Sequence, residues 1–377
     1  MQITNNSYKE ISNAEIISAM ENSDVTIGNN PSLPYIIEKT WNWPHITVAF
    51  FVDTVLVGIF TAVRIRNVYV SLPHFSHSAY WVDTSHLIKK LERNVPDIDL
   101  SEEELIHLFY GFFNKVLEEN SGKNQASVKL KTDLSLSNVL DKIKTNTKEN
   151  SLQIESRSFQ TLTDNYANHK TISEICLAAT MDSQMQSFSP SVKRKIRKAR
   201  SNGIEIFVGD SEYLKDFYSV YRKNIHRLGS FALPYRFYEN LLCDYSNGIC
   251  KIIIAKLQGK VVGSAILLSF MDYSENPWFA TLKEYNRLYV SYALHEKMLE
   301  LAIAEKCRVY SMGRSTIDSG VHKYKMQWGG NDKTLFYNFT FPHKAIAENT
   351  RIINSVIKRL PQSFVKIFDS FVSKFIY

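Results

Sequence analysis

The sequence predicts an α/β protein that contains two copies of one domain, followed by a helical C-terminal segment. Strand, polar turn and strand follow one another at residues 46–58 and again at 251–263, and both hairpins end in Val-Gly. Each hairpin continues as a strand and is followed by a long amphipathic helix and a further strand. Because the order of elements is the same in both halves, it indicates a duplicated α/β domain.

Length and composition agree with this prediction. A chain of 377 residues favours two or three domains, and 44% hydrophobic with 22% charged residues is a globular composition that excludes a long disordered protein or a fibre. The net charge of +7 is mild for this length. The four cysteines form no Cys-x-x-Cys pair, so we expect reduced thiols rather than a disulfide framework or a structural zinc site.

The sequence also predicts a cytoplasmic location. The first residues, Met1–Asn6, lack the basic and apolar regions of a secretory signal. No run of about 18 apolar residues occurs, so we expect no membrane-spanning helix.

The first predicted domain covers residues 1–168. After its hairpin, Ser101–Glu104 forms a capping box at the start of the long helix. The apolar stripe of that helix consists of Leu105, Ile106, Leu108, Phe109, Phe112, Phe113, Val116 and Leu117. A strand at 126–131 follows, and the polar stretch 132–170, with a weak helix at 136–143, leads to a boundary near 165–170.

The second predicted domain covers residues 169–342. It begins with a strand at 171–181, and the hairpin, a helix over roughly 288–306 and a strand at 308–312 follow. The helix has an apolar stripe formed by Leu294, Met298, Leu301 and Ala302. The last strand of this domain is predicted at 334–341.

Residues 343–377 are predicted to form an amphipathic helical tail that is broken at Pro361. Its apolar stripes are Ile352, Ile353, Val356, Ile357 and Leu360, then Phe364, Val365, Phe368, Phe371, Val372 and Phe375. Six basic and two acidic residues lie between Lys344 and Lys374. Two interpretations stay open: the tail packs on the second domain or on another subunit, or it docks on the inner surface of an anionic membrane.

A strongly basic helix is predicted over residues 189–203, with Ser189 as cap, Pro190 at the first position and Gly203 at the exit. One face is apolar, and the other faces carry Lys193, Arg194, Lys195, Arg197, Lys198 and Arg200. Such a helix is either a solvated surface or a binding site for a diphosphate, a nucleotide-sugar, a lipid head group or RNA. DNA is not expected, since no base-reading motif accompanies it.

Two further segments carry polar side chains where a ligand could reach them. A helix that ends near Leu228-Gly229 leaves Asn224, His226 and Arg227 at its C-terminal end, although ordinary helix capping explains them equally well. A buried strand brings Gly313, Arg314 and Ser315 to its carboxyl end, where α/β folds place ligands, and Tyr324, Lys325 and Trp328 follow. The alternative for Arg314 is an ion pair with a carboxylate across the sheet.

Several standard chemistries lack their motifs. The sequence contains neither a G-x-x-x-x-G-K-[ST] loop nor a G-x-G-x-x-G fingerprint, and it has no G-x-S-x-G nucleophile elbow. His74 and His77 have no clear third ligand, so no metal site is predicted.

Taken together, these segments resemble the Fem-type (FemAB-like) aminoacyltransferase family of the GNAT acyltransferase superfamily. Residues 194–203 resemble the family pattern R-x-x-I-R-K-A-x-x-x-G but are one residue shorter. Residues 217–230 resemble the pattern F-Y-x-x-Y-x-x-N-x-R-x-L-G-[ST]. A third pattern, G-R-S-x-x-x-S-G-x-x-x-[FY]-K-x-Q-W-G, resembles residues 313–329. The similarity covers roughly 185–340 and is greatest to the branch found with bacterial exopolysaccharide and exosortase clusters. His226 stands where Arg is common, and Val321-His322 where Thr-Tyr is common.

The resemblance implies two GNAT-like domains, each with a mixed, mostly antiparallel sheet flanked by helices. It implies acyl or aminoacyl transfer to an amine on a cell-envelope or exopolysaccharide precursor that carries a diphosphate. In such enzymes two neighbouring strands separate and free N–H groups polarise the acyl carbonyl; by position this separation would follow residues 278–283. The stretch 285–292 lacks the glycines of an acetyl-CoA pyrophosphate loop, so the donor stays open between acyl-CoA and aminoacyl-tRNA.

The resemblance and the residue patterns together give the candidate site. The catalytic candidates are Arg314, Tyr324 and Lys325. The substrate-binding candidates are Arg194, Arg197, Lys198, Asn224, Arg227, Ser315 and Trp328, of which the first three would hold phosphates. No permanently bound cofactor is expected. The expected partners are a nucleotide- or lipid-linked sugar or peptide precursor, with tRNA as a further candidate. The alternative function is a non-catalytic GNAT-fold protein that scaffolds polysaccharide synthesis.

Overall fold

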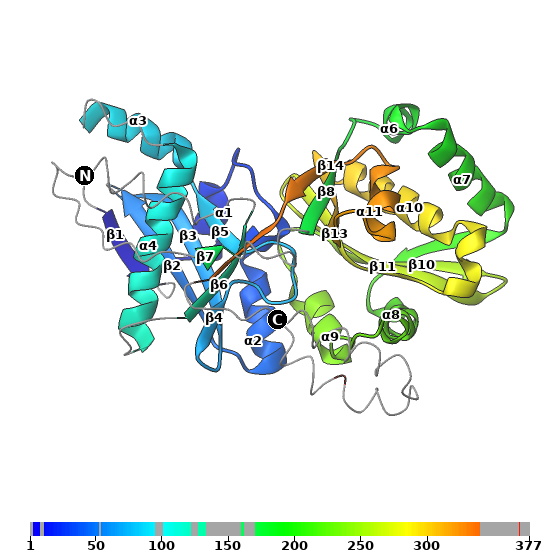
Figure 1. The fold of residues 1–377 in the computed structure, drawn as a ribbon, viewed down its shortest axis with the longest axis horizontal. Coiled ribbons are helices and arrows are strands. Elements are labelled where there is room, and N and C mark those ends of the chain that lie inside the picture. The colour runs from blue at the N-terminus through cyan, green and yellow to red at the C-terminus, as the bar shows by residue number, and fades with distance from the viewer. Residues whose placement is uncertain are drawn as a thin grey trace. The chain divides into compact units, whose positions relative to one another are not determined.

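The computed structural model describes residues 3–7, 11–52, 54–94, 101–121, 127–132, 160–161, 170–339 and 369. The chain divides into two compact units. The first comprises residues 1–38, 42–168 and 334–344, and the second comprises 39–41, 169–333 and 345–377. Each unit contains a mixed sheet with helices packed on it (Figure 1), which confirms the predicted fold class.

The first unit is built on a sheet in the order β1-β2-β3-β4-β6-β15-β7, with β5 also paired to β3. Its strands are β1 (Ile3–Ser7), β2 (His45–Val52), β3 (Val55–Ile65), β4 (Val68–Val70), β5 (Ala79–Val82), β6 (Ser127–Thr132), β7 (Gln160–Thr161) and β15 (Phe336–Phe339). Its helices are α1 (Asn13–Ala19), the short 3-10 helix η2 (Ile27–Asn29), α2 (Ser32–Trp41), α3 (Thr84–Asn94) and α4 (Glu102–Ser121). The core packs α4 on the β2–β3 hairpin, which confirms the predicted hairpin and long helix.

The second unit repeats this plan with the sheet order β14-β8-β13-β12-β11-β10-β9. Its strands are β8 (Lys170–Cys176), β9 (Ile204–Gly209), β10 (Cys250–Leu257), β11 (Lys260–Phe270), β12 (Tyr273–Thr281), β13 (Val309–Thr316) and β14 (Asn331–Thr334). Its helices are α6 (Met181–Ser187), α7 (Pro190–Ser201), η3 (Ser211–Tyr213), α8 (Leu214–Leu228), α9 (Tyr235–Asp244), η4 (Lys283–Leu288), α10 (Val290–Ala304) and α11 (Gly320–Met326).

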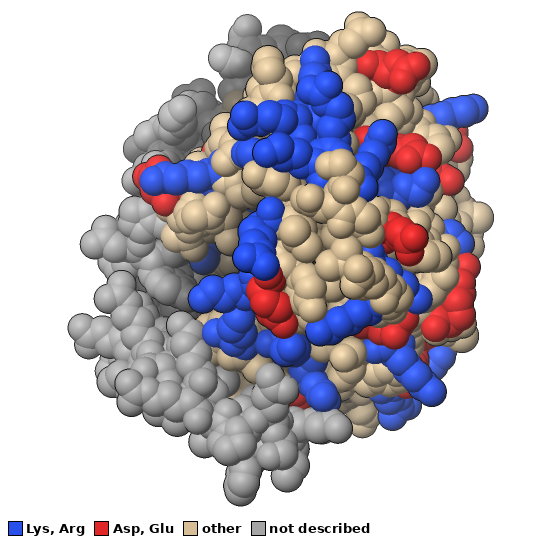
Figure 2. Space-filling view, turned by 90° about the vertical axis from the view of Figure 1, so that its right-hand side faces the viewer, with Lys and Arg blue, Asp and Glu red and all other residues tan. Residues whose placement is uncertain are grey.

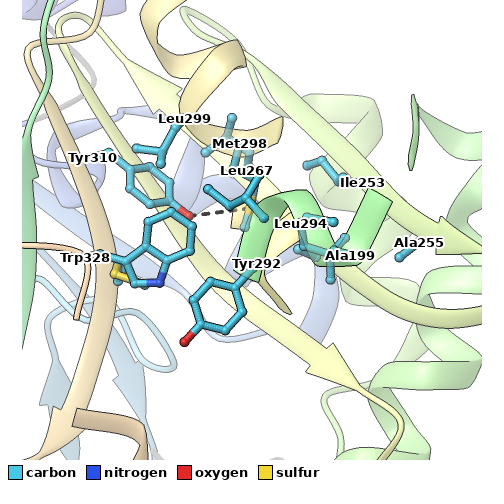
Figure 3. Packing of buried hydrophobic residues seen from close by; sticks show 14 of the residues in the cluster. Ala199, Ile253, Ala255, Leu267, Tyr292, Leu294, Met298, Leu299, Tyr310 and Trp328 are labelled. Atoms are coloured by element: carbon cyan, nitrogen blue, oxygen red, sulfur yellow. Dashed lines mark hydrogen bonds between the residues drawn. The ribbon is translucent and has the colours of Figure 1, made fainter. Parts of the chain in front are cut away.

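The core of the second unit lies between the sheet and the helices α7 and α10. Leu294, Met298 and Leu299 of α10 pack on Ile253 and Leu267 of the sheet (Figure 3). The helices α8 and α9 cover the opposite face, where aromatic rings dominate the packing. Both faces of the central strands are therefore buried, which explains their nearly continuous apolar sequence.

The repeated Val-Gly marks the place where the long helix crosses the sheet. A Cβ at Gly58 would lie 3.2 Å from the ring of Phe109 in α4. A Cβ at Gly263 would lie 2.6 Å from Val290 and 3.0 Å from Leu294 in α10. Glycine at each position lets the helix approach the strand closely, so the two halves share a packing requirement as well as an order of elements.

The structure differs from the sequence prediction in three segments. The strand predicted over residues 334–341 with the second domain is β15, which pairs with β6 in the sheet of the first unit. The strand predicted at 171–181 ends at Cys176, since the Thr180 side chain caps α6. The weak helix at 136–143 and the apolar stripes of the tail lie outside the described residues, but Asp369 of the tail is buried. None of the helices in the described ranges has the length and apolar character needed to cross a membrane.

Candidate active site

In the second unit, the parallel strands β12 and β13 separate after a short stretch of pairing. They pair at Tyr273–Glu275 and Val309–Ser311. Beyond these residues β12 stays with β11, and β13 stays with β8. We call the region between residues 276–281 and 312–316 the strand fork. It is the counterpart of the strand separation that the resemblance to GNAT enzymes predicts.

The fork begins earlier than the sequence prediction placed it. The separation was expected after residues 278–283, but pairing with β13 already stops at Glu275. A bulge at Asn276-Pro277 lies directly beyond that pair, because Pro277 has no N–H to donate to the ladder. A second bulge, at Met312-Gly313, bends β13 away, and Gly313 adopts a left-handed φ of 69° there.

Lys325 of α11 lies against the β13 side of the strand fork. Its ammonium nitrogen donates hydrogen bonds to the carbonyl oxygens of Gly313 (2.5 Å) and Arg314 (3.0 Å), and the residue is only 6% exposed. Burial lowers the pKa of Lys325 to about 7, and the carboxylates of Glu275 and Asp332 oppose this shift. An amine with this pKa exchanges its proton near neutral pH, as a general acid or base does.

Two groups beside Lys325 were not singled out from the sequence. The ring of His295 in α10 stacks on Phe279 at 4.6 Å, and its Nδ1 lies 2.8 Å from the hydroxyl oxygen of Tyr310. Burial, together with the charge of Lys325, lowers the pKa of His295 to about 3, so its imidazole is neutral. Glu275 is 1% exposed on β12. The sequence indicates each of them only as a single ionisable residue within an otherwise apolar helix or strand.

The end of β13 and α11 bring most of the catalytic candidates together. Ser315 is buried, and its hydroxyl has no hydrogen-bond partner among the described residues. The side chain of Arg314 is exposed, while its carbonyl accepts from Lys325. The ring of Tyr324 packs edge-on against Tyr292 at 5.2 Å, and burial raises its pKa, so this phenol remains protonated at neutral pH.

Trp328 lies in the core rather than on a binding surface. It is 1% exposed, and its ring packs edge-on against Phe188 at 5.3 Å. It also stacks on Tyr292, with ring centres 5.4 Å apart; both residues are labelled in Figure 3. The sequence predicts Trp328 as a substrate-binding residue. The structure favours a packing role, in which Trp328 fixes α11 and thereby the position of Lys325.

The basic helix α7 forms as predicted, with Ser189 as its cap and Pro190 in its first turn. Figure 2 shows lysine and arginine side chains gathered on the face of the second unit that carries α7. Arg194, Arg197 and Lys198, the predicted phosphate-binding residues, are all exposed. Three other cations of α7 have partners: Lys193 donates to the carbonyl of Gln186, Lys195 donates to Tyr292 and Gln327, and Arg200 pairs with Glu296.

These cations approach the N-terminal end of α10. The Nζ atom of Lys195 lies 4.9 Å from the ring centre of Tyr292, and that of Lys198 lies 6.0 Å from the ring centre of Tyr289. Tyr289 itself adopts a left-handed φ of 63° just before the helix. The position where GNAT enzymes carry a glycine loop is thus a turn with aromatic rings and cations beside it.

The C-terminal end of α8 holds the remaining candidates. Gly229 ends the helix with a φ of 84°. Arg227 donates to the side-chain oxygen of Asn224 at 2.7 Å, so these two candidates bind each other. His226 lies 3.0 Å from both carboxylate oxygens of Asp369, and the Ala232 N–H donates to the same carboxylate at 3.1 Å. No cluster of metal-ligating side chains occurs in the ranges that the structure describes.

Comparison with known proteins agrees with this geometry. The family model of the acetyltransferase (GNAT) domain matches residues 186–326. The crystal structure of FemX superposes with a TM-score of 0.65 at 13% identity, covering 95% of this chain and 100% of FemX. None of the curated proteins matches this sequence.

Two further solved structures are more distant. The C-terminal domain of a putative lysylphosphatidylglycerol synthetase from Agrobacterium fabrum has a TM-score of 0.47 at 9% identity, covering 92% of this chain and 98% of that one. A tandem GNAT protein from the clavulanic acid biosynthesis pathway has a TM-score of 0.46 at 8% identity, covering 91% and 100%. Residues 186–326 thus match the family model of the GNAT acetyltransferase domain, and the chain as a whole has the fold of FemX.

Proposed function

We propose that this protein is an N-acyltransferase that forms an amide on a cell-envelope or exopolysaccharide precursor. The observation that carries the proposal is Lys325, a buried amine with a pKa of about 7 that contacts the β13 side of the strand fork. The GNAT domain match and the shared fold of FemX support acyl transfer as the reaction class. The aminoacyl donor and the exopolysaccharide acceptor rest on the sequence resemblance alone.

In the proposed reaction the acceptor amine attacks the acyl carbonyl carbon of the donor. Neutral Lys325 takes the proton that the attacking nitrogen loses, while its two N–H bonds point at the carbonyls of Gly313 and Arg314. The bond to the leaving group then breaks, and the Lys325 ammonium gives this proton to the departing sulfur of an acyl-CoA or ribose oxygen of a tRNA, which restores the neutral amine. His295 stays neutral beside this site, so it adds no further positive charge next to Lys325.

The phosphates of the substrates would bind at α7. Arg194, Arg197 and Lys198 are exposed on this helix, and Lys198 lies near the turn that precedes α10. Arginine and lysine bind phosphate oxygens through charge-assisted hydrogen bonds. The diphosphate of a nucleotide- or lipid-linked precursor and the phosphates of an acyl-CoA or an aminoacyl-tRNA all fit this chemistry. A cytoplasmic enzyme would meet each of these compounds.

The test is to incubate the protein with nucleotide-linked amino sugars or muropeptides and with acyl-CoA or aminoacyl-tRNA donors. We expect an acceptor whose mass has increased by one acyl group. The variants Lys325→Met and Lys325→Arg should both lose about 10²–10⁴-fold in rate, because neither offers a neutral amine. Lys323→Met, on the exposed side of α11, is the matched control and should keep the wild-type rate.

Other outcomes would change the assignment. Activity that Lys325→Arg retains would mean that positive charge, rather than proton transfer, is what the site requires. Binding of the precursors without any product across the panel would favour the alternative, a non-catalytic protein that scaffolds polysaccharide synthesis.

A further inference from the structure

The helix α11, which carries Lys325, is also held by hydrogen bonds through His322. The Nε2 atom of His322 lies 2.5 Å from the Oδ2 atom of Asp332 in β14. The other ring nitrogen, Nδ1, accepts the backbone N–H of Asp318 at 3.0 Å. A ring nitrogen that accepts a hydrogen bond carries no hydrogen, so the proton of the imidazole is on Nε2 and is donated to Asp332. Both ring nitrogens are therefore used, and they fix the His322 side chain in one orientation.

Asp332 connects this helix to the sheet. Its second carboxylate oxygen, Oδ1, accepts from the hydroxyl of Ser173 in β8 at 2.8 Å. The chain reaches Asp332 from α11 through a turn in which Gly329 adopts a left-handed φ of 75°. The helix itself has only seven residues, and so short a helix depends on contacts with the rest of the fold. One carboxylate thus ties α11 to the neighbouring strands β14 and β8 (Figure 1).

The position of α11 decides where the ammonium of Lys325 lies. Lys325 follows His322 by three residues, so the two side chains are neighbours on the helix surface. Both residues are buried, with 8% of His322 and 6% of Lys325 exposed. The ammonium meets the carbonyl oxygens of Gly313 and Arg314 at the end of β13. A displaced α11 would lose these two hydrogen bonds and let water reach the amine.

Charged groups from several elements act on this ammonium. Burial, the largest effect, and the guanidinium of Arg314 lower the pKa of Lys325, whereas the carboxylates of Glu275 and Asp332 raise it. Glu275 is 1% exposed, but the Asp332 side chain keeps 30% of its surface, so it can be altered with less disturbance of the core. The neutral titratable groups on the surrounding elements are His295, Tyr310, His322 and Tyr324.

We propose that His322 and Asp332 are positioning residues for Lys325. His322 fixes α11 so that the ammonium meets the end of β13, and Asp332 supplies a negative charge that stabilises the ammonium form. The pair thus has two separable effects, one on position and one on charge. The inference rests on the proposed function of Lys325, but both effects can be measured without a substrate.

The test follows the lysine side chains by NMR in full-length protein labelled with ¹³C-lysine. The signal that is lost in Lys325→Met identifies Lys325, and its titration between about pH 5 and pH 10 should give a midpoint near 7 in the wild type. Asp332→Asn keeps an acceptor for His322 and gives Ser173 a donor, but it removes the charge. The Lys325 midpoint should therefore fall by about one pH unit.

His322→Leu tests the effect on position, because it removes both hydrogen bonds of the ring and leaves the carboxylate in place. Water should then reach Lys325, and the midpoint should rise toward the value of about 10.4 for a free lysine. His322→Gln again offers an N–H to Asp332 and should restore most of the wild-type midpoint. A pair that only stabilised the fold would lower the melting temperature without moving the midpoint in opposite directions.

Asp182→Asn is the matched control, because it removes one carboxylate charge at an exposed position of α6 in the same unit. It should leave the Lys325 midpoint at the wild-type value. The proposal is overturned if either Asp332→Asn or His322→Leu leaves the midpoint unchanged or moves it the other way. A protein without turnover would contradict the proposed function but would leave these midpoints measurable. Thermal melting of each variant shows whether it is folded during the titration.

Discussion

At the scale of single residues, the pH dependence of the reaction reports the role of Lys325. If its neutral amine accepts the proton, kcat/KM should rise with pH and level off above the pKa of about 7 that burial imposes. The measurement is a pH–rate profile of the wild-type enzyme with its amine acceptor in excess. A rate that falls above pH 7 would show that the ammonium form is needed, for example to stabilise the oxyanion of the tetrahedral intermediate.

The same lowered pKa predicts a pH dependence of stability. In the unfolded chain a lysine keeps its proton up to about pH 10.4, whereas folded Lys325 releases it near pH 7. Between these values the unfolded state binds more protons, so the contribution of this group makes the free energy of unfolding rise with pH. Urea unfolding at pH 6, 8 and 9.5 should show this rise, and Lys325→Met should flatten it. An equal slope in both proteins would mean that Lys325 titrates normally.

The sequence could identify only part of the site at this scale. Arg314 and Lys325 belong to recognisable motifs, and the structure joins them through the end of β13. Glu275 and His295 were missed because each stands alone in an apolar element, and only the fork brings them near Lys325. The sequence predicts Trp328 as a substrate-binding residue, although it is buried, because aromatic residues occur both in cores and on binding surfaces.

At the scale of elements, the close contact of α10 with β11 should make Gly263 intolerant of a side chain. In Gly263→Ala the new Cβ would meet Val290 at 2.6 Å, so α10 has to shift. We expect a loss of about 1–3 kcal/mol in the free energy of unfolding, measured with urea. Gly320→Ala is the control, since a Cβ there has open space. Equal stability of the two variants would contradict this packing.

If α7 binds the phosphates of the substrate, the affinity of the protein for that substrate depends on the cations of this helix. Replacing Arg194 and Arg197 by alanine should weaken binding of the phosphate-bearing substrate without lowering the melting temperature, because both side chains are exposed. Lys215→Ala on α8 is the control. If the ligand is aminoacyl-tRNA, the logarithm of the affinity should fall with the logarithm of the salt concentration by about 0.7–0.9 per phosphate contacted. If the affinity for tRNA does not change with salt concentration, α7 is not the tRNA-binding site.

At the scale of the whole molecule, the two units share one order of elements but differ where their parallel strands separate. The shared hairpin, helix and strand were readable from the sequence because they follow from apolar periodicity and from glycines under the long helices. The difference between the two units at this place could not be predicted from the sequence. It depends on a bulge at Asn276-Pro277 in the second unit and on a loop, residues 71–78, held by Lys131 in the first. Such differences arise from non-local hydrogen bonds, which no periodicity records.

The last prediction concerns the tail, where Asp369 joins His226 and the Ala232 N–H in a buried cluster. These contacts fix Asp369 to the second unit, and docking on a membrane through residue 369 would have to break the cluster. Asp369→Ala should therefore lower the free energy of unfolding by about 1–3 kcal/mol, because two buried donors lose their acceptor. Asp182→Ala, at an exposed position in α6, is the control and should cost less. In flotation with anionic vesicles we expect the full-length chain to stay unbound. Flotation of the full-length chain, but not of a version ending at Pro342, would instead establish the tail as a membrane anchor.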